Sequence, residues 1–290
     1  MIITVLKEVR KIEIKTRQLV EGLIQGAYHS VFKGRGIEFS EVKEYIPGDD
    51  IRAIDWKVTA RMNKPFVKEF IEERDLTLYV VFDVSGSNEF GYKKTKKLLG
   101  IELVASLMFA AIRNNDRVGL CLFTDRIEKF VVAKKGRKHV LRLIRELLYF
   151  KPESKKTDLN YVLSLLARII KKSAIIFIVS DFLTGDFYKP LKVLKNKHDI
   201  ICINIMDVNE YELPDVGYVI LEDEESNEQI VINTSNLAVR EKYKRYVVKN
   251  LEKLKRNLKR VNIDLIQIKT DEPFIAPLRK FFKLREKRIR

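Results

Sequence analysis

Four largely apolar runs constrain the fold of this 290-residue chain more than any other feature of its sequence. They read "LTLYVVFDV" (76–84), "RVGLCLF" (117–123), "AIIFIVSDF" (174–182) and "DIICINIMD" (199–207). Strands that are apolar on both faces are typical of a parallel sheet held between two layers of helices. Segments with the apolar spacing of helices separate these runs. The pattern therefore predicts an α/β fold with an open, mainly parallel sheet and helices on both faces.

The other predicted elements divide the chain into two parts. Residues 1–75 are expected to hold an N-terminal helix that ends near Gly26, followed by a small β-rich segment with a turn at Pro47-Gly48. Residues 76–290 are expected to form the α/β domain with basic C-terminal helices. Its predicted helices cover 92–113, 137–149, a segment starting at Thr157 or Asp158, 188–196, 237–261 and a segment after Pro273. Its further predicted strands are 126–133 beside 117–123, a hairpin across 217–234, and 263–268.

The net charge of +16 is concentrated at the C-terminal end of the chain. Residues 240–290 hold 18 Lys and Arg against six Asp and Glu, which gives +12 of the total. A basic segment of this kind could contact nucleic acid, an anionic membrane surface or an acidic protein, or it could be a solvated helix face. The sequence leaves these alternatives open.

The chain shows no sign of membrane insertion or secretion. Its longest nearly apolar stretch, 101–112, contains Glu102 and is far too short to span a bilayer. The N-terminus lacks the pattern of a signal peptide. Cys121 and Cys202 each lie inside an apolar run, so we expect buried thiols in a reducing compartment. The predicted location is cytoplasmic.

Oxygen-bearing side chains follow two of the apolar runs where each strand is expected to end. Asp83, Ser85 and Ser87 form the stretch "DVSGS", and Asp181 follows "FIVS". Thr157 lies on a loop that opens a predicted helix. In open parallel sheets ligands bind at the carboxyl ends of the strands, and Mg²⁺ prefers oxygen ligands. Together the residues favour a metal site, although each alone could be a turn residue or a helix cap.

These residues resemble those of von Willebrand factor A domains. Asp83 to Ser87 match the D-x-S-x-S motif, Thr157 resembles the loop threonine of that family, and Asp181 resembles its second aspartate. The resemblance implies a metal-ion-dependent adhesion site with Mg²⁺ or Mn²⁺ as cofactor. Its ligands would be Asp83, Ser85, Ser87, Thr157 and Asp181. With at most two negative charges, such a site leaves room for one further carboxylate from a partner.

The stretch from Arg35 to Asp75 resembles the signature of an uncharacterised prokaryotic family in which a von Willebrand A-like domain follows directly. Members of that family are commonly encoded beside MoxR-type AAA+ ATPases. The resemblance implies a metal-dependent interaction protein that is not an enzyme. It would act as an adaptor or co-chaperone-like partner of such an ATPase in the assembly or maturation of protein complexes.

Two other functions remain as alternatives. A metal-dependent phosphohydrolase or nuclease could use the same carboxylates, but a two-metal site needs more ligands than two aspartates and three hydroxyls. Nucleic-acid binding could use the basic C-terminal part, and we regard it as less favoured. In the interaction hypothesis that part attracts an acidic partner. The candidate residues are Lys253, Lys255, Arg256, Lys259 and Arg260.

Overall fold

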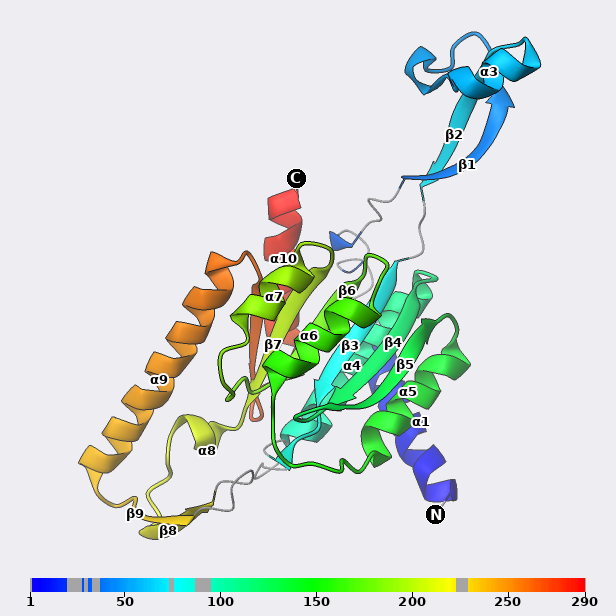
Figure 1. The fold of residues 1–290 in the computed structure, drawn as a ribbon. Coiled ribbons are helices and arrows are strands. Elements are labelled where there is room, and N and C mark those ends of the chain that lie inside the picture. Colours follow the sequence, from blue (N-terminus) through cyan, green and yellow to red (C-terminus); the bar gives the residue numbers. More distant parts are fainter. Residues whose placement is uncertain are drawn as a thin grey trace. The chain divides into compact units, whose positions relative to one another are not determined.

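The computed structural model describes residues 2–19, 28, 31–32, 37–72, 76–86, 95–222 and 229–289 (Figure 1). By their internal contacts, residues 1–31 and 77–290 form one compact unit, here called the larger unit. Residues 32–76 form a second, smaller unit. The N-terminal helix, which the sequence groups with residues 1–75, thus has its packing contacts in the larger unit.

Six described strands of the larger unit form one sheet in the order β10-β7-β6-β3-β4-β5. Neighbouring strands are parallel except β4 and β5, which pair antiparallel at one edge. The strands are β3 (Thr77–Asp83), β4 (Arg117–Phe123), β5 (Ile127–Lys134), β6 (Ile175–Ser180), β7 (Asp199–Met206) and β10 (Asp264–Lys269). The four apolar runs supply β3, β4, β6 and β7, which are buried along almost their whole length. This confirms the predicted open, mainly parallel sheet.

Helices cover both faces of this sheet (Figure 1). They are α1 (Ile2–Leu19), α4 (Lys96–Arg113), α5 (Arg137–Tyr149), α6 (Leu159–Ile169), α7 (Tyr188–Lys195), α8 (Val208–Tyr211), α9 (Leu237–Arg260) and α10 (Ile275–Ile289). α6 and α7 lie on one face, while α1, α4 and α5 lie on the other. β8 (Tyr218–Glu222) and β9 (Gln229–Asn233) form the predicted hairpin outside the sheet. Among the described residues, no helix is long and apolar enough to cross a membrane.

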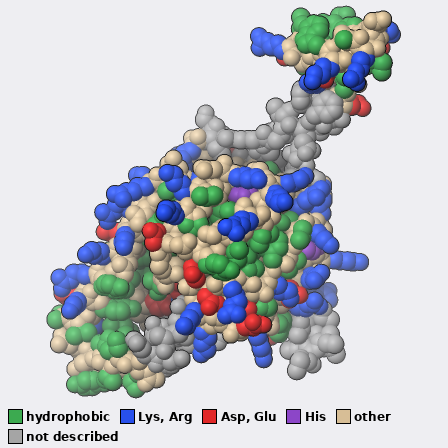
Figure 2. Space-filling view, in the orientation of Figure 1, with side chains coloured by type: hydrophobic (Ala, Val, Ile, Leu, Met, Phe, Trp, Pro, Cys, Tyr) green, Lys and Arg blue, Asp and Glu red, His purple; other side chains and the backbone are tan. Residues whose placement is uncertain are grey.

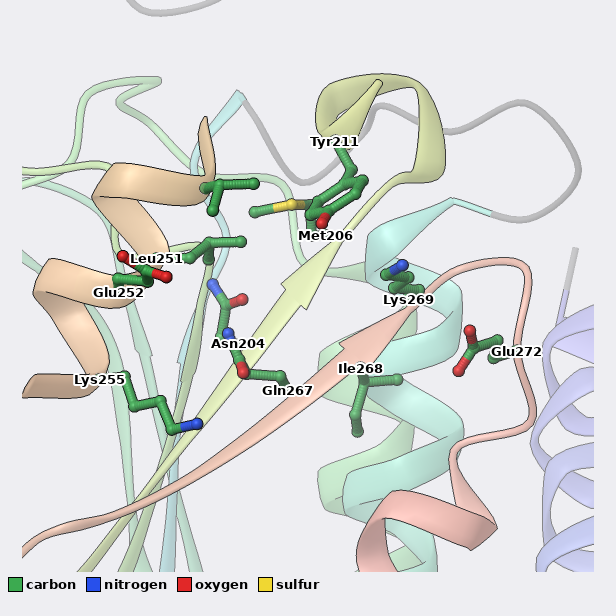
Figure 3. Close-up of a pocket in the computed structure, with 11 residues that line it drawn as sticks. Asn204, Met206, Tyr211, Leu251, Glu252, Lys255, Gln267, Ile268, Lys269 and Glu272 are labelled. Atoms are coloured by element: carbon green, nitrogen blue, oxygen red, sulfur yellow. The ribbon is translucent and has the colours of Figure 1, made fainter. Parts of the chain in front are cut away.

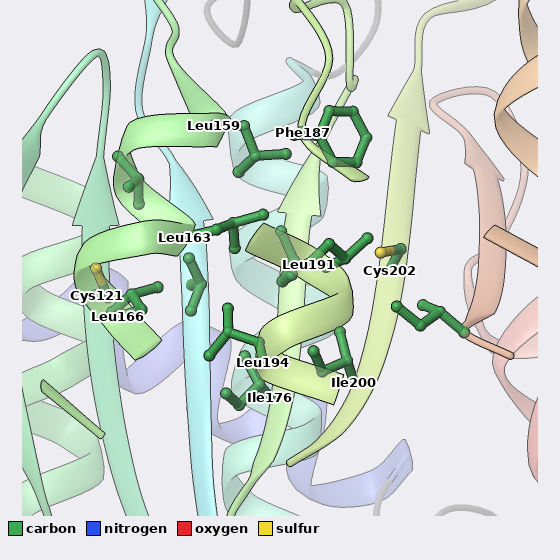
Figure 4. Packing of buried hydrophobic residues seen from close by; sticks show 14 of the residues in the cluster. Cys121, Leu159, Leu163, Leu166, Ile176, Phe187, Leu191, Leu194, Ile200 and Cys202 are labelled. Carbon is green, nitrogen blue, oxygen red and sulfur yellow. The ribbon is translucent and has the colours of Figure 1, made fainter. Parts of the chain in front are cut away.

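The core on the α6 and α7 face joins these helices to the sheet (Figure 4). Leu163 and Leu166 of α6 and Leu194 of α7 pack with strand residues that include both cysteines. Cys121 and Cys202 are fully buried free thiols, as the sequence predicts. Burying apolar surface in this way is the main favourable contribution to folding.

On the opposite face α4 lies close to the sheet. A Cβ atom at Gly100 would come within 2.9 Å of the Phe82 ring, so glycine is what permits this approach. α4 also contacts α1, and Lys15 forms a 2.9 Å ion pair with Glu102 between them. The predicted end of the N-terminal helix near Gly26 lies outside the described residues. Close packing of α4 on β3 matters for function because it fixes the first turn of α4 at the end of that strand.

The smaller unit consists of a hairpin with two short helical segments. β1 (Ile37–Glu44) pairs with β2 (Phe66–Glu72), and η2 (Ile51–Ala53) and α3 (Trp56–Met62) lie between them in the chain. The predicted Pro47-Gly48 turn is present: Gly48 has φ +115°, and Asp49 N–H donates to the Ile46 carbonyl at 3.0 Å. Asp55 caps α3 by accepting from the N–H groups of Lys57 and Val58. The carboxylates of Asp49 and Asp50 accept hydrogen bonds from the backbone N–H groups of Ile46 and Arg52, so these three aspartates have local structural roles.

Candidate metal centre

The parallel register of β3 and β6 brings their carboxyl ends together. Phe82 pairs with Val179, so Asp83 and Ser180, one residue further along each strand, lie side by side. The Ser180 hydroxyl donates a 2.7 Å hydrogen bond to Asp83 Oδ2. Asp181 follows directly. The two aspartates that the sequence singled out are therefore delivered to the same edge by adjacent strands, as predicted for an open α/β sheet.

Asp83 is fully buried and hydrogen-bonded through both carboxylate oxygens. Oδ1 accepts from the Ser85 N–H at 3.0 Å, and Oδ2 accepts from Ser180. Burial raises the pKa of Asp83 to about 7, with the charge of Asp181 adding to the rise. Hydrogen bonds from Ser85 and Ser180 act in the opposite direction but are outweighed. In the absence of a cation, an ionised Asp83 is thus energetically unfavourable.

Asp181 is also buried, with 6% of its surface exposed. Its Oδ1 accepts from the Leu183 N–H at 3.1 Å, and its backbone carbonyl accepts from Asn204 Nδ2 at 2.9 Å. The next residue, Phe182, has the left-handed conformation at φ +57°, which is uncommon for a non-glycine residue. This turn and the two hydrogen bonds fix the direction of the Asp181 side chain at the end of β6.

The loop that carries Thr157 joins the same edge. Gly86 N–H donates to the Lys155 carbonyl at 3.1 Å, and the Thr184 hydroxyl donates to the Thr157 carbonyl at 3.2 Å. This loop therefore contacts both the segment after Asp83 and the segment after Asp181. The helix cap is Asp158, whose side chain accepts from the Tyr161 N–H, so the hydroxyl of half-buried Thr157 does not serve as the cap of α6. Asp83, Ser85 and Asp181 lie at this edge, and the hydrogen bonds of the loop connect the segment that carries Thr157 to it. These four residues are called the oxygen cluster below. Ser87 lies outside the described residues.

Two charged residues of this edge were not predicted from the sequence. Lys96, the first residue of α4, is fully buried, and its Nζ lies 3.1 Å from Asp181 Oδ2 and 2.7 Å from Glu210 Oε1. Burial lowers the pKa of Lys96, but the charges of Asp181 and Glu210 outweigh it and the net pKa is raised. Burial raises the pKa of Glu210 despite its contact with Lys96. The only sequence signal was the D-x-x-E spacing from Asp207, which marks the capping box of α8.

The charges of this cluster fit a divalent cation. Lys96 pairs with Asp181 and Glu210, and Asp83 interacts with Asp181 through its charge. Full ionisation of these three carboxylates and the one ammonium group leaves two excess negative charges. Carboxylate and hydroxyl oxygens are ligands that Mg²⁺ and Mn²⁺ accept. Among the described residues, no three His, Cys, Asp or Glu side chains are grouped so that they could hold a metal by themselves. The hydroxyls of Ser85 and Thr157 would have to complete the coordination.

The predicted basic residues lie away from this edge. α9 runs antiparallel to the strands: Tyr243 Oη donates to the Glu210 carbonyl at 3.0 Å near its start, and its end leads into β10 (Figure 1). The predicted basic residues are exposed and occupy the last turns of α9: Lys253, Lys255, Arg256, Lys259 and Arg260. At 1.5 Å per residue they lie roughly 15 Å or more beyond Tyr243 along the helix. The structure does not bring them together with the oxygen cluster, although Figure 2 shows Lys and Arg side chains along the α9 side of the larger unit.

A cavity of about 320 Å³ lies between α9 and the ends of β7 and β10 (Figure 3). Its lining includes Asn204, Tyr211, Glu252, Lys255 and Lys269. Asn204 also donates a hydrogen bond from its amide to the Asp181 backbone carbonyl. Lys269 Nζ lies 4.3 Å from the centre of the Tyr211 ring, a cation–π contact.

A mainly parallel sheet with one antiparallel edge strand, helices on both faces and oxygen-bearing side chains at its carboxyl edge is the architecture expected of a von Willebrand A-like fold. Residues 41–253 match the family described as "Protein of unknown function DUF58", and the chain belongs to this family. A relative in Mycobacterium tuberculosis, "Uncharacterized protein Rv1480", is 28% identical over 284 residues, covering 96% of this chain and 89% of its own length. YeaD of Bacillus subtilis is 27% identical over 108 residues, which are 37% of this chain and 25% of YeaD.

Solved structures with similar folds are distant in sequence. BatB from Bacteroides thetaiotaomicron is 12% identical, with a TM-score of 0.43 over 74% of this chain and 98% of BatB. The VWA domain of SpRpn10 is 13% identical, with a TM-score of 0.39 over 70% and 93%. Proximal thread matrix protein 1 from the mussel byssus, in a form with a zinc-occupied MIDAS motif, is 13% identical, with a TM-score of 0.39 over 73% and 47%.

Proposed function

We propose that this chain is a metal-dependent protein-interaction module and not an enzyme. The observation that carries the proposal is the pair of buried carboxylates, Asp83 and Asp181, at the carboxyl edge of adjacent strands. Burying two like charges side by side is costly unless a cation balances them. Lys96 supplies one positive charge, and with Glu210 as the third carboxylate a divalent cation would balance the remaining two negative charges.

The residues that would hold Mg²⁺ or Mn²⁺ are Asp83, Ser85, Ser87, Thr157 and Asp181. When bound, the metal supplies an electrophilic coordination position that suits one further carboxylate. The protein's own contribution is to hold the oxygen donors in place: Ser180 orients Asp83, and the Leu183 N–H orients Asp181. Mg²⁺ keeps several waters in most protein sites, which leaves a position for exchange with a partner's side chain.

The partner that we propose is a MoxR-type AAA+ ATPase, with an acidic side chain completing the metal shell. The support is membership of the DUF58 family. Residues 35–75 also resemble a family whose members are commonly encoded beside such ATPases. The chain has no G-x-x-x-x-G-K-[ST] phosphate-binding sequence, so nucleotide hydrolysis would be the task of the partner. A single metal bridge is a short contact, and surrounding surface must contribute the rest of the affinity.

Binding to an immobilised MoxR-type ATPase from the same organism tests this function. We expect binding in Mg²⁺ and a loss of at least about tenfold in affinity for Asp83→Ala, because the metal bridge is absent. Asp271→Ala is the matched control, since Asp271 is an exposed aspartate outside the cluster. Using variants in constant Mg²⁺ keeps the ATPase and its own metal unchanged, which chelation with EDTA would not. Equal binding of wild type and Asp83→Ala would contradict the metal-bridged interface.

The same purified protein distinguishes the alternatives. A metal-dependent hydrolase would turn over phosphodiesters or nucleotides with Mn²⁺, and activity would depend on Asp181. A nucleic-acid binder would bind a labelled duplex with an affinity that falls steeply with salt, through the basic face of α9. Neither outcome requires the ATPase.

A further inference from the structure

Lys96 stands in an unfavourable position for a lysine. It is the first residue of α4, after the N-cap Thr95, and its side chain is fully buried. The N-terminus of a helix carries a partial positive charge, which repels a cation, and removing an ammonium group from water is energetically costly. Among the described residues, the carboxylates of Asp181 and Glu210 offset both effects. The burial of Lys96 beside Asp181 despite these energetic costs indicates a role at the candidate metal centre.

The two partners of Lys96 are fixed to different degrees. Glu210 is held on both sides, because Oε1 contacts Lys96 at 2.7 Å while Oε2 accepts from the Asp207 N–H at 3.0 Å in the capping box of α8. The contact with Asp181 Oδ2 is longer, at 3.1 Å. Asp181 uses its other oxygen for the Leu183 N–H. Oδ2 is therefore the Asp181 oxygen that both a metal and Lys96 would use.

We propose that Lys96 is a tethered counter-ion of the metal centre. Without metal its ammonium group neutralises Asp181. When a divalent cation enters, Lys96 gives up Asp181 and keeps Glu210, so the lysine sets the affinity of the site by competing for one carboxylate. This inference rests on the proposed metal site and adds to it a residue that belongs to neither the D-x-S-x-S motif nor the other predicted ligands.

Replacing Lys96 and replacing its partner Glu210 should have opposite effects on the affinity of the site for metal. Lys96→Met removes the competitor, so Asp181 becomes fully available and the metal binds more tightly. Glu210→Gln removes the alternative partner, so Lys96 is held more firmly by Asp181 and the metal binds more weakly. A lysine that merely supports the structure predicts something else: loss of Lys96 would loosen the site and weaken metal binding.

Titration with Mn²⁺ in a calorimeter, using the full chain, tests the proposal. We expect Lys96→Met to lower the Mn²⁺ dissociation constant by at least about tenfold, since a unit charge at this distance is a strong competitor even when screened. Lys96→Arg keeps the charge and should bind within about threefold of wild type. Lys97→Met, which removes the same charge from the next residue of α4, is the matched control and should change the constant by less than about twofold.

The outcomes separate this proposal from the proposed function. Equal or weaker Mn²⁺ binding by a folded Lys96→Met protein overturns the counter-ion while the metal site of the wild type stands. If Lys96→Met does not fold, Glu210→Gln decides, because it keeps the lysine: weaker binding supports the proposal, and equal or tighter binding overturns it. Binding by Lys96→Met but not by the wild type supports competition by the lysine and contradicts the proposed metal-dependent function of the wild type. No binding by any folded variant removes the metal site and the counter-ion together.

Discussion

The Ser180 hydroxyl joins the ends of two strands by donating a 2.7 Å hydrogen bond to Asp83 Oδ2. Ser180 Oγ also accepts a hydrogen bond from the Phe182 N–H at 3.0 Å, so one buried side chain connects β6, β3 and the turn after Asp181. Hydrogen bonds to charged groups are stronger than neutral ones, and a buried partner left unsatisfied is costly. Ser180 therefore holds the oxygen cluster in place, although it is not one of its predicted ligands.

Replacing Ser180 with alanine should lower the free energy of unfolding by about 1–3 kcal/mol, measured by urea denaturation without metal. Ser164→Ala is the matched control. Its hydroxyl donates to a backbone carbonyl on the exposed side of α6, and the loss should stay within about 0.5 kcal/mol. Equal losses of unfolding free energy in the two variants would contradict a larger stabilising contribution from the Ser180–Asp83 hydrogen bond.

The pH dependence of stability should reveal the buried Asp83. Its pKa is raised to about 7 from an ordinary value of 3.8, so between these values the folded protein keeps a proton that the unfolded chain has lost. Stability then falls as pH rises through this window, and the penalty is complete above pH 7. We expect the melting temperature of the metal-free wild type to fall more steeply between pH 5 and 8 than that of Asp83→Asn.

The comparison with Asp83→Asn is needed because other groups titrate in the same range. Burial lowers the pKa of both His139 and His198, which makes stability rise with pH up to about 6.5. These groups are present in both proteins, so the difference between the two curves isolates Asp83. Parallel curves would mean that Asp83 is not destabilised by burial in the metal-free protein.

Association with the proposed acidic partner should become several-fold slower in 20 mM salt when glutamine replaces the basic residues at the end of α9. These residues are Lys253, Lys255, Arg256, Lys259 and Arg260. The effect should largely vanish at physiological ionic strength, where exposed charges are screened within about 8 Å. These residues lie away from the metal edge, so the variant should keep the dependence on Asp83. Surface plasmon resonance at two salt concentrations measures both properties, and a loss of the Asp83 dependence would place the basic face in the metal interface itself.

Purified protein should hydrolyse neither nucleotides nor phosphodiesters above background with Mg²⁺ or Mn²⁺. The cluster offers few ligands for a two-metal reaction. A colorimetric phosphate assay and a labelled oligonucleotide cover both substrate classes. Turnover by the wild type that is lost in Asp181→Ala would contradict the proposed interaction module and show that the protein is an enzyme.

The sequence reveals those parts of the site that local pattern controls. Asp83 and Asp181 could be placed because apolar runs mark strand ends, and parallel strands present those ends on one edge. Ser180 lies in the apolar run that Asp181 follows, but its hydrogen bond to Asp83 depends on the register between β3 and β6. Asp158 rather than Thr157 caps α6, a choice between neighbouring residues that backbone conformation decides.

Lys96 and Glu210 could not be found from the sequence because they are 114 residues apart and meet only through the fold. A lysine at the start of a helix is ordinarily an exposed residue, and its burial follows from the close packing of α4 on β3. The basic residues of α9 show the opposite limitation. Their clustering in the sequence was evident, but the direction of the helix places them toward the amino edge of the sheet, away from Asp83.

Calorimetric titration of wild type, Asp83→Ala and Asp271→Ala with Mg²⁺ and Mn²⁺ tests the central claim, a metal centre at the carboxyl edge, most directly. We predict one site in the wild type and in Asp271→Ala, and none in Asp83→Ala. A metal-induced rise in melting temperature should accompany binding in the first two proteins and be absent from the third. Binding of equal strength in Asp83→Ala, or no binding by folded wild type, would contradict the account.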